Sequence, residues 1–477
     1  MLSDPLAWVR QHGVVVSEGA LAGLLEQRQQ LLERQHALEL ASRQLSKAIG
    51  AAKAQGAPFA ELLERKRVVS AEEKALRGVL KEREAGIVTL LTAAPAGNDD
   101  RAIAPPAAGE AGTATAAAAS AAAATAAAEH TIDLAALVVS VVTGPPAADW
   151  DDFVGTHAEA TVYHLSAFKR IVEDSFGHDT LYLQARSHGT LQGLLPLVRL
   201  QSRLFGDFLV SMPFFNYGGV LARSDAVAEQ LLQYARTVAL EQGCSHIEYR
   251  HLRPRPGLPL RDDKVAMWLA LPPTEAQLWR ALGSKLRSQI KRAERFDLSV
   301  DCGGVELVDD FYQVFAHNMR DLGTPVYARQ FFHNIMTSPL PDKRLVIVRR
   351  GGEPVSAALL IGFRDRMEVP WASTLRSANR FDANMFLYWE LLRQACGSGY
   401  RLFDFGRSTR DAPTYRFKKQ WGAEPRQLYW HYWLAAGGEP PRMNPDNPKY
   451  RAVIALWQRL PVWLTRLVGP HIVKYLP

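Results

Sequence analysis

An approximate internal repeat between residues 132 and 436 most constrains how this chain can fold. The segment HLSAFKRIVEDSFGHDTLYLQARSHGTLQGLLPLV has the pattern of a helix, a strand, a tight turn and a strand. The segment ARQFFHNIMTSPLPDKRLVIVRRGGEPVSAALLIG has the same order, with Gly351 and Gly352 in the turn. Further along, AVAEQLLQYARTVALEQG and HIEYRHL match NMFLYWELLRQACGSG and RLFDFGRST as a helix and a strand. The repeat predicts two similar α/β units, and a cleft between them is the natural ligand site.

A heptad pattern of leucines precedes the repeat. Leucines recur every seven residues, and Gly50, Gly56 and Pro58 then interrupt the helical pattern. A second apolar stripe follows, so the pattern predicts an antiparallel helical hairpin with Lys47 and Lys53 near its tip. Polar residues at the complementary seam positions favour packing within one chain, and dimerisation through this coiled coil is the alternative.

Changes in composition mark the expected domain boundaries. Between the hairpin and the repeat, Ala, Pro, Gly and Thr predominate and large apolar residues are few, which predicts a flexible linker. A basic helix, SKLRSQIKRAER, leads into the second unit. The predicted regions are a coiled-coil arm at 18–95, the linker at 96–131, the first unit at 132–275, the second unit at 276–436 and a C-terminal helical extension at 437–477.

The overall composition is that of a globular protein that stays in the cytoplasm. Hydrophobic residues make up 47% and charged residues 22%, so most of the chain can bury a core. The excess of 56 basic over 49 acidic residues allows, without requiring, a polyanionic partner such as RNA or an anionic membrane. We expect neither a signal peptide nor a membrane-spanning helix. The amphipathic C-terminal segment could dock on its own domain or contact the inner face of the cytoplasmic membrane peripherally.

Several chemistries lack their sequence motifs. The chain has no Walker loop, no HExxH and no GxSxG. The cysteines lie far apart, and His157 and His164 have no neighbouring cluster of ligand residues, so neither a disulfide framework nor a metal site is predicted. We therefore expect no metal and no cofactor.

Motifs in both units and at the C-terminus carry a resemblance to a known family. They are SKLRSQIKRAER, NMRDLGTPVY, FDFGRST with TYRFKKQWGA, the PFFNYGG turn and the closing WQRLPVWLTRLVGP. Together, over residues 150–477, they resemble FemAB-related proteins associated with PEP-CTERM and exosortase exopolysaccharide loci. The repeated order of elements resembles the GNAT acyltransferase fold in tandem, which is the architecture of the FemAB and FemX peptidyltransferases. The resemblance implies an α/β (α+β) fold with two tandem GNAT-like units and an acyl or aminoacyl transferase activity.

The N-terminal hairpin resembles a different family. The segment RQLSKAIGAAKAQG and the helix after it are similar to the tRNA-binding arm of seryl-tRNA synthetases. Because FemX-type enzymes take an aminoacyl group from charged tRNA, the two resemblances together imply aminoacyl-tRNA as the donor, with Lys47 and Lys53 at its phosphates. The glycine-rich pyrophosphate loop of acetyl-CoA-dependent GNAT enzymes is not evident, but acyl-CoA or an acyl carrier protein is the alternative donor.

Residues suited to acyl transfer occur in the second unit. Forming an amide from an ester or thioester needs a neutral amine, a route for its proton and positive charge near the developing oxyanion. By the resemblance, Lys418 would neutralise charge on the donor and Phe417 would pack the site; the alternative for Lys418 is a surface charge. Asp321 is a candidate to orient or deprotonate the acceptor amine, and Asp404 is its competitor. Arg407 could bind a phosphate bidentately or pair with Asp404.

Further residues are candidates for binding substrate or phosphate. Each set has a structural alternative: a packed core for the aromatic residues, a plain turn for the NYGG residues and a solvated face for the basic helix. The substrate-binding candidates are Arg320, Tyr327, Trp371, Tyr388, Asn216 and Tyr217. The phosphate-binding candidates on the basic helix are Lys285, Arg287, Lys291, Arg292 and Arg295.

The sequence therefore predicts a cytoplasmic enzyme that forms an amide on an amine of a cell-envelope or exopolysaccharide precursor, with aminoacyl-tRNA as the preferred donor. An N-acyltransferase using acyl-CoA or an acyl carrier protein is the alternative enzyme. A non-catalytic scaffold in exopolysaccharide assembly is the alternative from another class, and it would keep its cellular role without Lys418.

Overall fold

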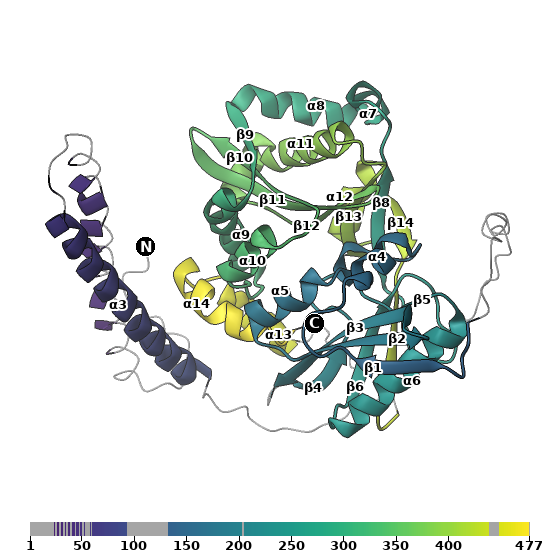
Figure 1. The fold of residues 1–477 in the computed structure, drawn as a ribbon. Helices are drawn as coiled ribbons and strands as arrows, with labels where there is room; N and C mark the ends of the chain where they lie inside the picture. The colour runs from purple at the N-terminus through teal and green to yellow at the C-terminus, as the bar shows by residue number, and fades with distance from the viewer. Residues whose placement is uncertain are drawn as a thin grey trace. The chain divides into compact units, whose positions relative to one another are not determined.

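The computed structural model describes residues 60–92, 132–202, 205–437 and 448–476, together with scattered positions between 23 and 58. The chain divides into two compact parts, an N-terminal part, Met1–Ala128, and a main body, Glu129–Pro477. Figure 1 labels the elements of both parts.

The N-terminal part contains the helix α3, Ala60–Thr92. Most of the described positions before it are also helical. Arg34 forms an ion pair with Glu72 of α3, with 2.5 Å between Nη2 and Oε1. These two residues lie on opposite sides of the predicted turn, as an antiparallel hairpin requires. The coiled-coil arm as a whole stays a prediction. Outside the described residues lie Lys47, Lys53 and the linker at 96–131.

The first unit of the main body is built on a mixed sheet with the strand order β1-β2-β3-β4-β6-β15-β7, and β5 pairs with β3. Within it, β4 and β6 are parallel, and the other pairs are antiparallel. The strands are β1 (Leu137–Val141), β2 (Thr180–Ser187), β3 (Thr190–Ser202), β4 (Gly206–Val210), β5 (Leu221–Ala222), β6 (His246–His251), β7 (Leu260–Arg261) and β15 (Tyr429–Leu434). The helices are α4 (Asp149–Thr156), the short 3₁₀ helix η1 (Val162–His164), α5 (Ala167–Phe176) and α6 (Asp225–Glu241).

The second unit has a sheet with the order β14-β8-β13-β12-β11-β10-β9. Again one pair, β12 and β13, is parallel. The strands are β8 (Lys264–Ala270), β9 (Leu298–Gly303), β10 (Asp342–Arg350), β11 (Glu353–Phe363), β12 (Arg366–Thr374), β13 (Leu402–Thr409) and β14 (Glu424–Gln427). The helices are α7 (Glu275–Ala281), α8 (Ser284–Ala293), η2 (Glu294–Phe296), η3 (Val305–Leu307), α9 (Val308–Leu322), α10 (Arg329–Thr337), η4 (Arg376–Phe381), α11 (Ala383–Gly397) and α12 (Pro413–Gln420).

The two units repeat one order of elements, so the predicted tandem α/β fold is confirmed. The order α5-β2-β3-β4-α6-β6 matches α10-β10-β11-β12-α11-β13, and each copy ends in a parallel pair. The units also exchange a strand, which the sequence did not predict. The strand β8 comes after the first repeat in the chain, but it pairs with β13 of the second. The strand β15 comes after the second repeat, but it pairs with β6 of the first. The exact limits of the two units stay predictions.

Turn residues set the register of the matching hairpins. Gly351 and Gly352 join β10 to β11 with φ of 57° and 84°, and His188 and Gly189 join β2 to β3 with φ of 47° and 78°. A two-residue turn of this kind needs positive φ at both positions, which glycine adopts without a Cβ clash. The predicted GG turn is therefore confirmed.

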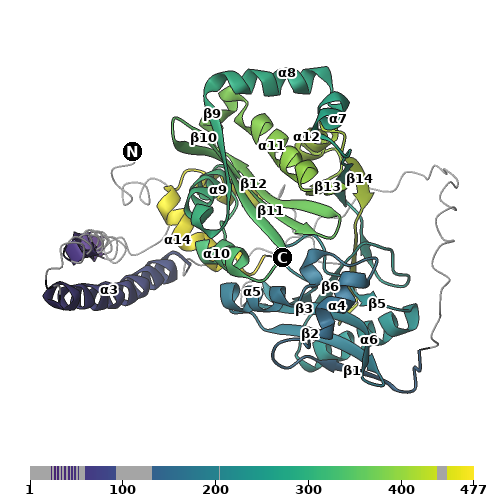
Figure 2. The ribbon, with the colours of Figure 1, turned by 45° about the horizontal axis from the view of Figure 1, so that its top comes forward.

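Both faces of the second sheet are buried. Leu345 and Ile347 belong to a core shared with the first unit, while Val346 and Val348 belong to the core beneath α11. Successive side chains of a strand point to opposite faces, so a strand covered on both faces needs a continuous apolar run. Figure 2 shows α11 and α8 above the sheet and the first unit below it.

The C-terminal extension packs on the main body. It contains α13, Pro448–Trp457, and α14, Val462–Val473. The guanidinium of Arg466 lies 4.9 Å from the ring centroid of Tyr312 on α9, and the carbonyl of Lys474 lies 2.6 Å from Nε2 of His178. In the part of the chain that the structure describes, no helix has the length and apolar character needed to cross a membrane. Peripheral membrane contact stays a prediction.

Candidate active site

The parallel strands β12 and β13 pair over a short stretch and then separate. Arg366, Met367 and Glu368 pair with Leu402, Phe403 and Asp404. Beyond these positions β12 continues beside β11, and β13 continues beside β8. Over residues 369–371 of β12 and 405–407 of β13, the two strands therefore no longer pair with each other. We call this region the strand separation.

Bulges on both strands lie at the point where they separate. On β12, Val369 and Pro370 stand opposite one residue of β11, and on β13, Phe405 and Gly406 stand opposite one residue of β8. Pro370 has no N–H to donate to a neighbouring strand, and Gly406 has a φ of 73°, which favours glycine. Because a bulge bends its strand, these residues direct β12 and β13 apart.

Two buried carboxylates, Glu368 and Asp404, lie side by side at the last paired position. Their neighbours Met367 and Phe403 belong to the core under α11, so both carboxylates face the first unit. Oε1 of Glu368 accepts hydrogen bonds from the Tyr163 hydroxyl at 2.7 Å and from Nδ2 of Asn216 at 2.8 Å. Glu368 is thus held by two residues of the first unit.

Asp404 is fully buried and accepts three hydrogen bonds. Its Oδ2 accepts from the Tyr217 hydroxyl at 2.5 Å and from Nε1 of Trp268 at 2.9 Å, and its Oδ1 accepts from the backbone N–H of Gly406 at 2.8 Å. Trp268 lies on β8, the exchanged strand. The predicted substrate residues Asn216 and Tyr217 therefore meet at the carboxylate pair, together with the predicted Asp404.

Burial and proximity shift the protonation of this pair. Burial, with the negative charge of Asp404, raises the pKa of Glu368 to about 8. Burial also raises the pKa of Asp404, although the positive charges of Arg366 and Lys418 oppose that shift. Glu368 is therefore mostly protonated at neutral pH, which avoids two adjacent buried negative charges. Among the described residues, no group of three or more His, Cys, Asp or Glu side chains is arranged to hold a metal ion.

Lys418 reaches the strand separation from α12. Its side chain is buried, and Nζ donates to the carbonyl oxygen of Arg407 at 2.8 Å and to that of Gly406 at 3.2 Å. Burial lowers the pKa of Lys418 to about 8, while the negative charge of Asp404 opposes the shift. Lys418 is therefore mostly cationic at neutral pH, and it is not the surface charge of the alternative interpretation. Its neighbour Lys419 is exposed.

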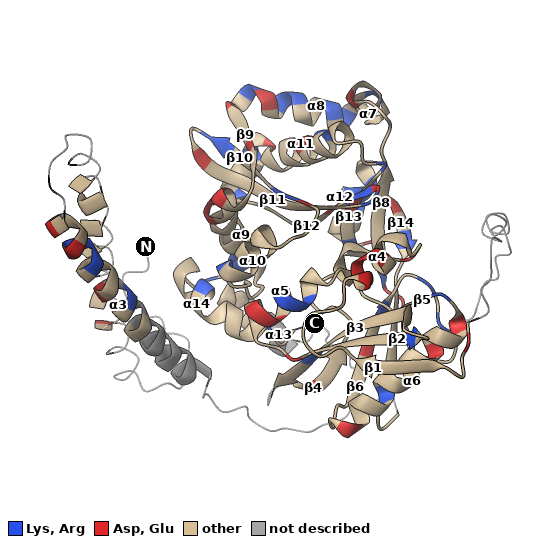
Figure 3. Cartoon of the chain, viewed as in Figure 1, with Lys and Arg blue, Asp and Glu red and all other residues tan. Residues whose placement is uncertain are grey.

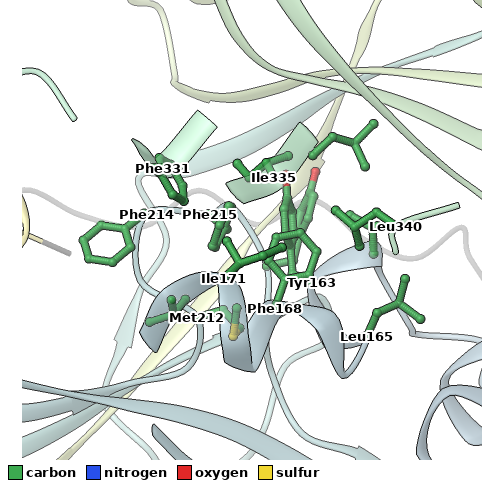
Figure 4. Close-up of a cluster of buried hydrophobic side chains, with 14 of the residues drawn as sticks. Tyr163, Leu165, Phe168, Ile171, Met212, Phe214, Phe215, Phe331, Ile335 and Leu340 are labelled. Carbon is green, nitrogen blue, oxygen red and sulfur yellow. The ribbon is translucent and has the colours of Figure 1, made fainter. Parts of the chain in front are cut away.

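The aromatic candidates lie on opposite faces of the second sheet. Phe417 and Tyr388 contact each other at 5.0 Å between ring centroids and belong to the core beneath α11. Tyr327 and Trp371, whose centroids are 6.1 Å apart, are half-buried against the shared core. Figure 4 shows Phe331, which contacts both, within that core.

The structure does not place Asp321 with the carboxylate pair. Asp321 lies at the C-terminal end of α9, where its Oδ1 is 2.6 Å from Nε of Arg320 and its Oδ2 is 3.7 Å from Nε of Arg376. Arg320 also donates to the carbonyl of Leu460 in the C-terminal extension. These contacts serve the docking of the extension, so Asp321 and Arg320 are separated from the other candidates.

The basic helix α8 presents its charges to solvent. Leu286, Ile290 and Ala293 form its buried face, and α8 packs on α11. Of the candidate phosphate-binding residues, Arg292 forms an ion pair with Asp382, and Arg287 is half-buried. Figure 3 colours the Lys and Arg positions along this helix blue. The exposed candidates are Lys285, Lys291, Arg292 and Arg295.

Sequence reasoning did not find Glu368, Tyr163 or Trp268. The sequence contained one signal for Glu368: it is the single charged residue in the apolar segment MEVPW, which is typical of a strand with little exposure to solvent. No pattern could show its partner, because strand pairing between β12 and β13 is set by the fold. Trp268 required knowledge of the strand exchange.

Comparisons with known proteins agree with this fold. The family model for the acetyltransferase (GNAT) domain matches residues 281–419. No curated protein matches. Among solved structures, FemX is 13% identical with a TM-score of 0.48, covering 62% of this chain and 97% of that chain. The C-terminal domain of a putative lysylphosphatidylglycerol synthetase from Agrobacterium fabrum is 13% identical with a TM-score of 0.42, covering 59% and 90%.

A tandem GNAT protein from the clavulanic acid biosynthesis pathway is 14% identical with a TM-score of 0.40, covering 64% of this chain and 100% of that chain. At these identities and scores, the structural likenesses assign no function to this chain. The family match includes both Asp404 and Lys418 and spans the strands on either side of the separation. Residues 281–419 of this chain are therefore similar to the acetyltransferase (GNAT) domain, a match that covers less than half of the chain.

Proposed function

We propose that the second unit is an acyl or aminoacyl transferase that forms an amide at the strand separation. The observation that carries the proposal is Lys418, a buried cation whose ammonium group lies on the carbonyl oxygens of Gly406 and Arg407. Burying a cation without a hydrogen-bonded carboxylate costs free energy, and strongly shifted pKa values gather at functional sites. The GNAT family match across this region supports the same activity.

The chemistry assigned to Lys418 is charge stabilisation. A neutral amine attacks the carbonyl carbon of an ester or thioester, the new C–N bond forms and the bond to the leaving oxygen or sulfur breaks. The amine loses a proton and the leaving group gains one. Negative charge develops on the carbonyl oxygen and on the leaving group, and a preorganised cation in a buried site stabilises both. Because Lys418 has a pKa of about 8, it carries this charge at neutral pH.

Asp404 is assigned a positioning role. Asp404 is fully buried, and both of its oxygens accept hydrogen bonds from the protein, so it is not exposed to an acceptor amine. It instead fixes Gly406, whose carbonyl holds Lys418, and Tyr217 from the first unit. Asp321, the other predicted carboxylate, is paired with two arginines. Of the two, Asp404 is the one that acts on the site.

We propose aminoacyl-tRNA as the donor and an amine of a cell-envelope or exopolysaccharide precursor as the acceptor. The exposed basic face of α8 supports a polyanionic donor, because phosphate backbones bind such faces through charge. An acyl-CoA or acyl carrier protein is the alternative donor. The same proposal includes a role in a PEP-CTERM or exosortase locus, peripheral membrane contact and dimerisation through the arm. A scaffold without activity would have no need of a buried cation at the strand separation.

Binding of tRNA tests the donor. Replacing Lys285, Lys291 and Arg295 together by Gln should weaken binding of charged bacterial tRNA to the full chain, measured by fluorescence anisotropy across a salt series. Each lost phosphate contact should reduce the slope of log K against log salt by about 0.7 to 0.9. These side chains are exposed, so the substitutions should leave the fold intact.

The matched control replaces Arg170, Arg253 and Arg426 by Gln, three exposed arginines outside α8. The control should bind tRNA with nearly the original salt slope. Equal losses in both triple variants would show only net-charge attraction and would reject α8 as the donor surface. If the unchanged protein binds no tRNA at low salt, the donor is an acyl thioester, and release of CoA or carrier thiol becomes the assay.

A further inference from the structure

Each unit carries an acidic residue followed by an arginine on the last strand of its repeat. On β6 these are Glu248 and Arg250, and on β13 they are Asp404 and Arg407. Glu248 pairs across the parallel strands with Val210, as Asp404 pairs with Glu368, so the two acids occupy equivalent places. The exchanged strand supplies a matching donor in each case, the Tyr432 hydroxyl to Glu248 and Trp268 to Asp404.

Arg250 is almost completely buried and uses only part of its guanidinium. Nε donates to Glu248 at 2.8 Å, and Nη1 donates to the carbonyl of Phe215 at 2.6 Å and to that of Met212 at 3.3 Å. Nη2 is buried and has no hydrogen-bond partner within the described chain. An unsatisfied buried N–H group is costly, and it indicates a partner that the protein alone does not supply.

Arg407 differs from Arg250 because of the bulge at Gly406. The inserted residue places Arg407 three positions after Asp404, and both oxygens of that acid accept from other donors. The side chain of Arg407 consequently has no ion pair or hydrogen bond with any described residue. Its guanidinium carbon lies 5.1 Å from the ring centroid of Trp430, and that of Arg250 lies 4.5 Å from the same centroid. Both arginines thus gather at one tryptophan.

The charges around Trp430 do not balance. Arg250 is paired with Glu248, and the neighbouring Arg261 is paired with Asp263 at 2.7 Å. Arg407 has no such partner, and its pKa falls to about 10 through burial and the charges of Arg250 and Arg261, against which Tyr327 and Glu248 act. Nη2 of Arg250 lies in the same group without a partner among the described residues, so one positive charge is uncompensated beside a buried N–H group that can still donate a hydrogen bond.

We propose that Arg407 and Nη2 of Arg250 bind one oxyanion, a carboxylate or a phosphoryl group, of the acyl donor or acceptor. Guanidinium groups suit both anions because their planar N–H pairs match two oxygens. The site adjoins the proposed reaction centre, since the carbonyl of Arg407 accepts a hydrogen bond from Lys418. The assignment of the anion to a substrate rests on the proposed function. The binding of an anion at this place does not.

The test measures binding of inorganic phosphate and of acetate to the full chain by isothermal titration calorimetry at constant ionic strength. We expect saturable binding of at least one anion to the unchanged protein, and the tighter one identifies the kind of group. Arg407→Gln should weaken that binding at least tenfold. Arg250 is left unchanged because it also holds two backbone carbonyls.

The matched control is Arg410→Gln, which removes an exposed arginine three residues along the chain. This variant should bind the anion as the unchanged protein does. The inference is overturned if neither anion saturates the unchanged protein, or if Arg410→Gln weakens binding as much as Arg407→Gln. Lys418→Met separates this inference from the proposed function: it should retain anion binding and lose turnover. Anion binding by a protein without transferase activity would leave the site standing and reject the function.

Discussion

Replacing Lys418 by Met should lower turnover by a factor of about 10² to 10³, which corresponds to about 3 to 4 kcal/mol of transition-state stabilisation. Methionine has a similar length and fills the same buried space, but it brings no charge to the strand separation. The two hydrogen bonds lost to the carbonyls of Gly406 and Arg407 are offset by the removal of a buried cation. The free energy of unfolding should therefore change by no more than about 1 kcal/mol.

The pH profile distinguishes a charge-stabilising lysine from a proton-accepting one. Because the pKa of Lys418 is about 8, a required cation predicts turnover that falls as pH rises through 8, and this alkaline limb should vanish from the residual activity of Lys418→Met. A rise through pH 8 that is present in the unchanged protein and absent from Lys418→Met would contradict the assigned role and make the neutral lysine a base. A rise shared by both proteins would come from the acceptor amine.

The control for Lys418 is its neighbour Lys419. Lys419→Met removes an exposed charge from the same helix and should leave turnover within about twofold of the original. Equal losses in the two variants would mean that the effect comes from the total positive charge of the lysines in the last turn of α12, and not from the buried ammonium. Unfolding in urea, measured for both variants, verifies that the comparison concerns folded protein.

The tandem α/β fold was predictable because its signals are local. The matching helix and strand patterns, and the Gly351–Gly352 turn, depend on residues that are close in sequence. The strand exchange was not predictable, because β8 and β15 have the same apolar character whichever sheet they join. Only the packed structure shows that β6, the last strand of the first repeat, pairs with β15, and that β13, the last strand of the second repeat, pairs with β8.

The candidate site was predictable in part for the same reason. FDFGRST indicated Asp404 and Arg407, because polar residues stand there at a strand end, whereas Lys418 came from the resemblance of YRFKKQWGA to the FemX family. Glu368 and Arg250 depend on partners more than 30 residues away in sequence, for which a single sequence carries no pairing signal. Asp321 looked equivalent to Asp404 in sequence, but its local arginines neutralise it.

The equivalence of the two units supports assigning the candidate site to the second one. In the first unit, Arg250 fills the region beyond the parallel pair β4–β6 and binds the carbonyls of Met212 and Phe215. That segment is buried and continues to Asn216 and Tyr217, which contact the carboxylates of the second unit. In the first unit, the segment from Met212 to Tyr217 thus covers the region beyond β4 and β6. The same segment supplies the hydrogen bonds to the carboxylates of the second unit.

Replacing Glu368 by Gln should flatten the pH dependence of stability between about pH 4.5 and pH 8. The pKa of Glu368 in the folded protein is raised to about 8, whereas an exposed glutamate titrates near 4.5. Between these values the folded protein binds the proton more tightly than the unfolded chain does. The stabilisation by this proton is therefore complete below pH 4.5 and is lost as pH rises through 8, by at most about 5 kcal/mol.

Gln keeps an oxygen that can accept from Tyr163 and Asn216, and it has no proton to lose. At pH 9 Glu368→Gln should therefore be more stable than the unchanged protein, and near pH 5 the two should be similar, measured by urea unfolding at each pH. Some slope should persist in the variant, because burial also raises the pKa of Asp404. Glu353→Gln, at the exposed turn before β11, is the control and should reproduce the original pH dependence. Parallel stability curves for Glu368→Gln and the unchanged protein would mean that Glu368 binds its proton no more tightly in the folded protein than in the unfolded chain, and that it is ionised at neutral pH.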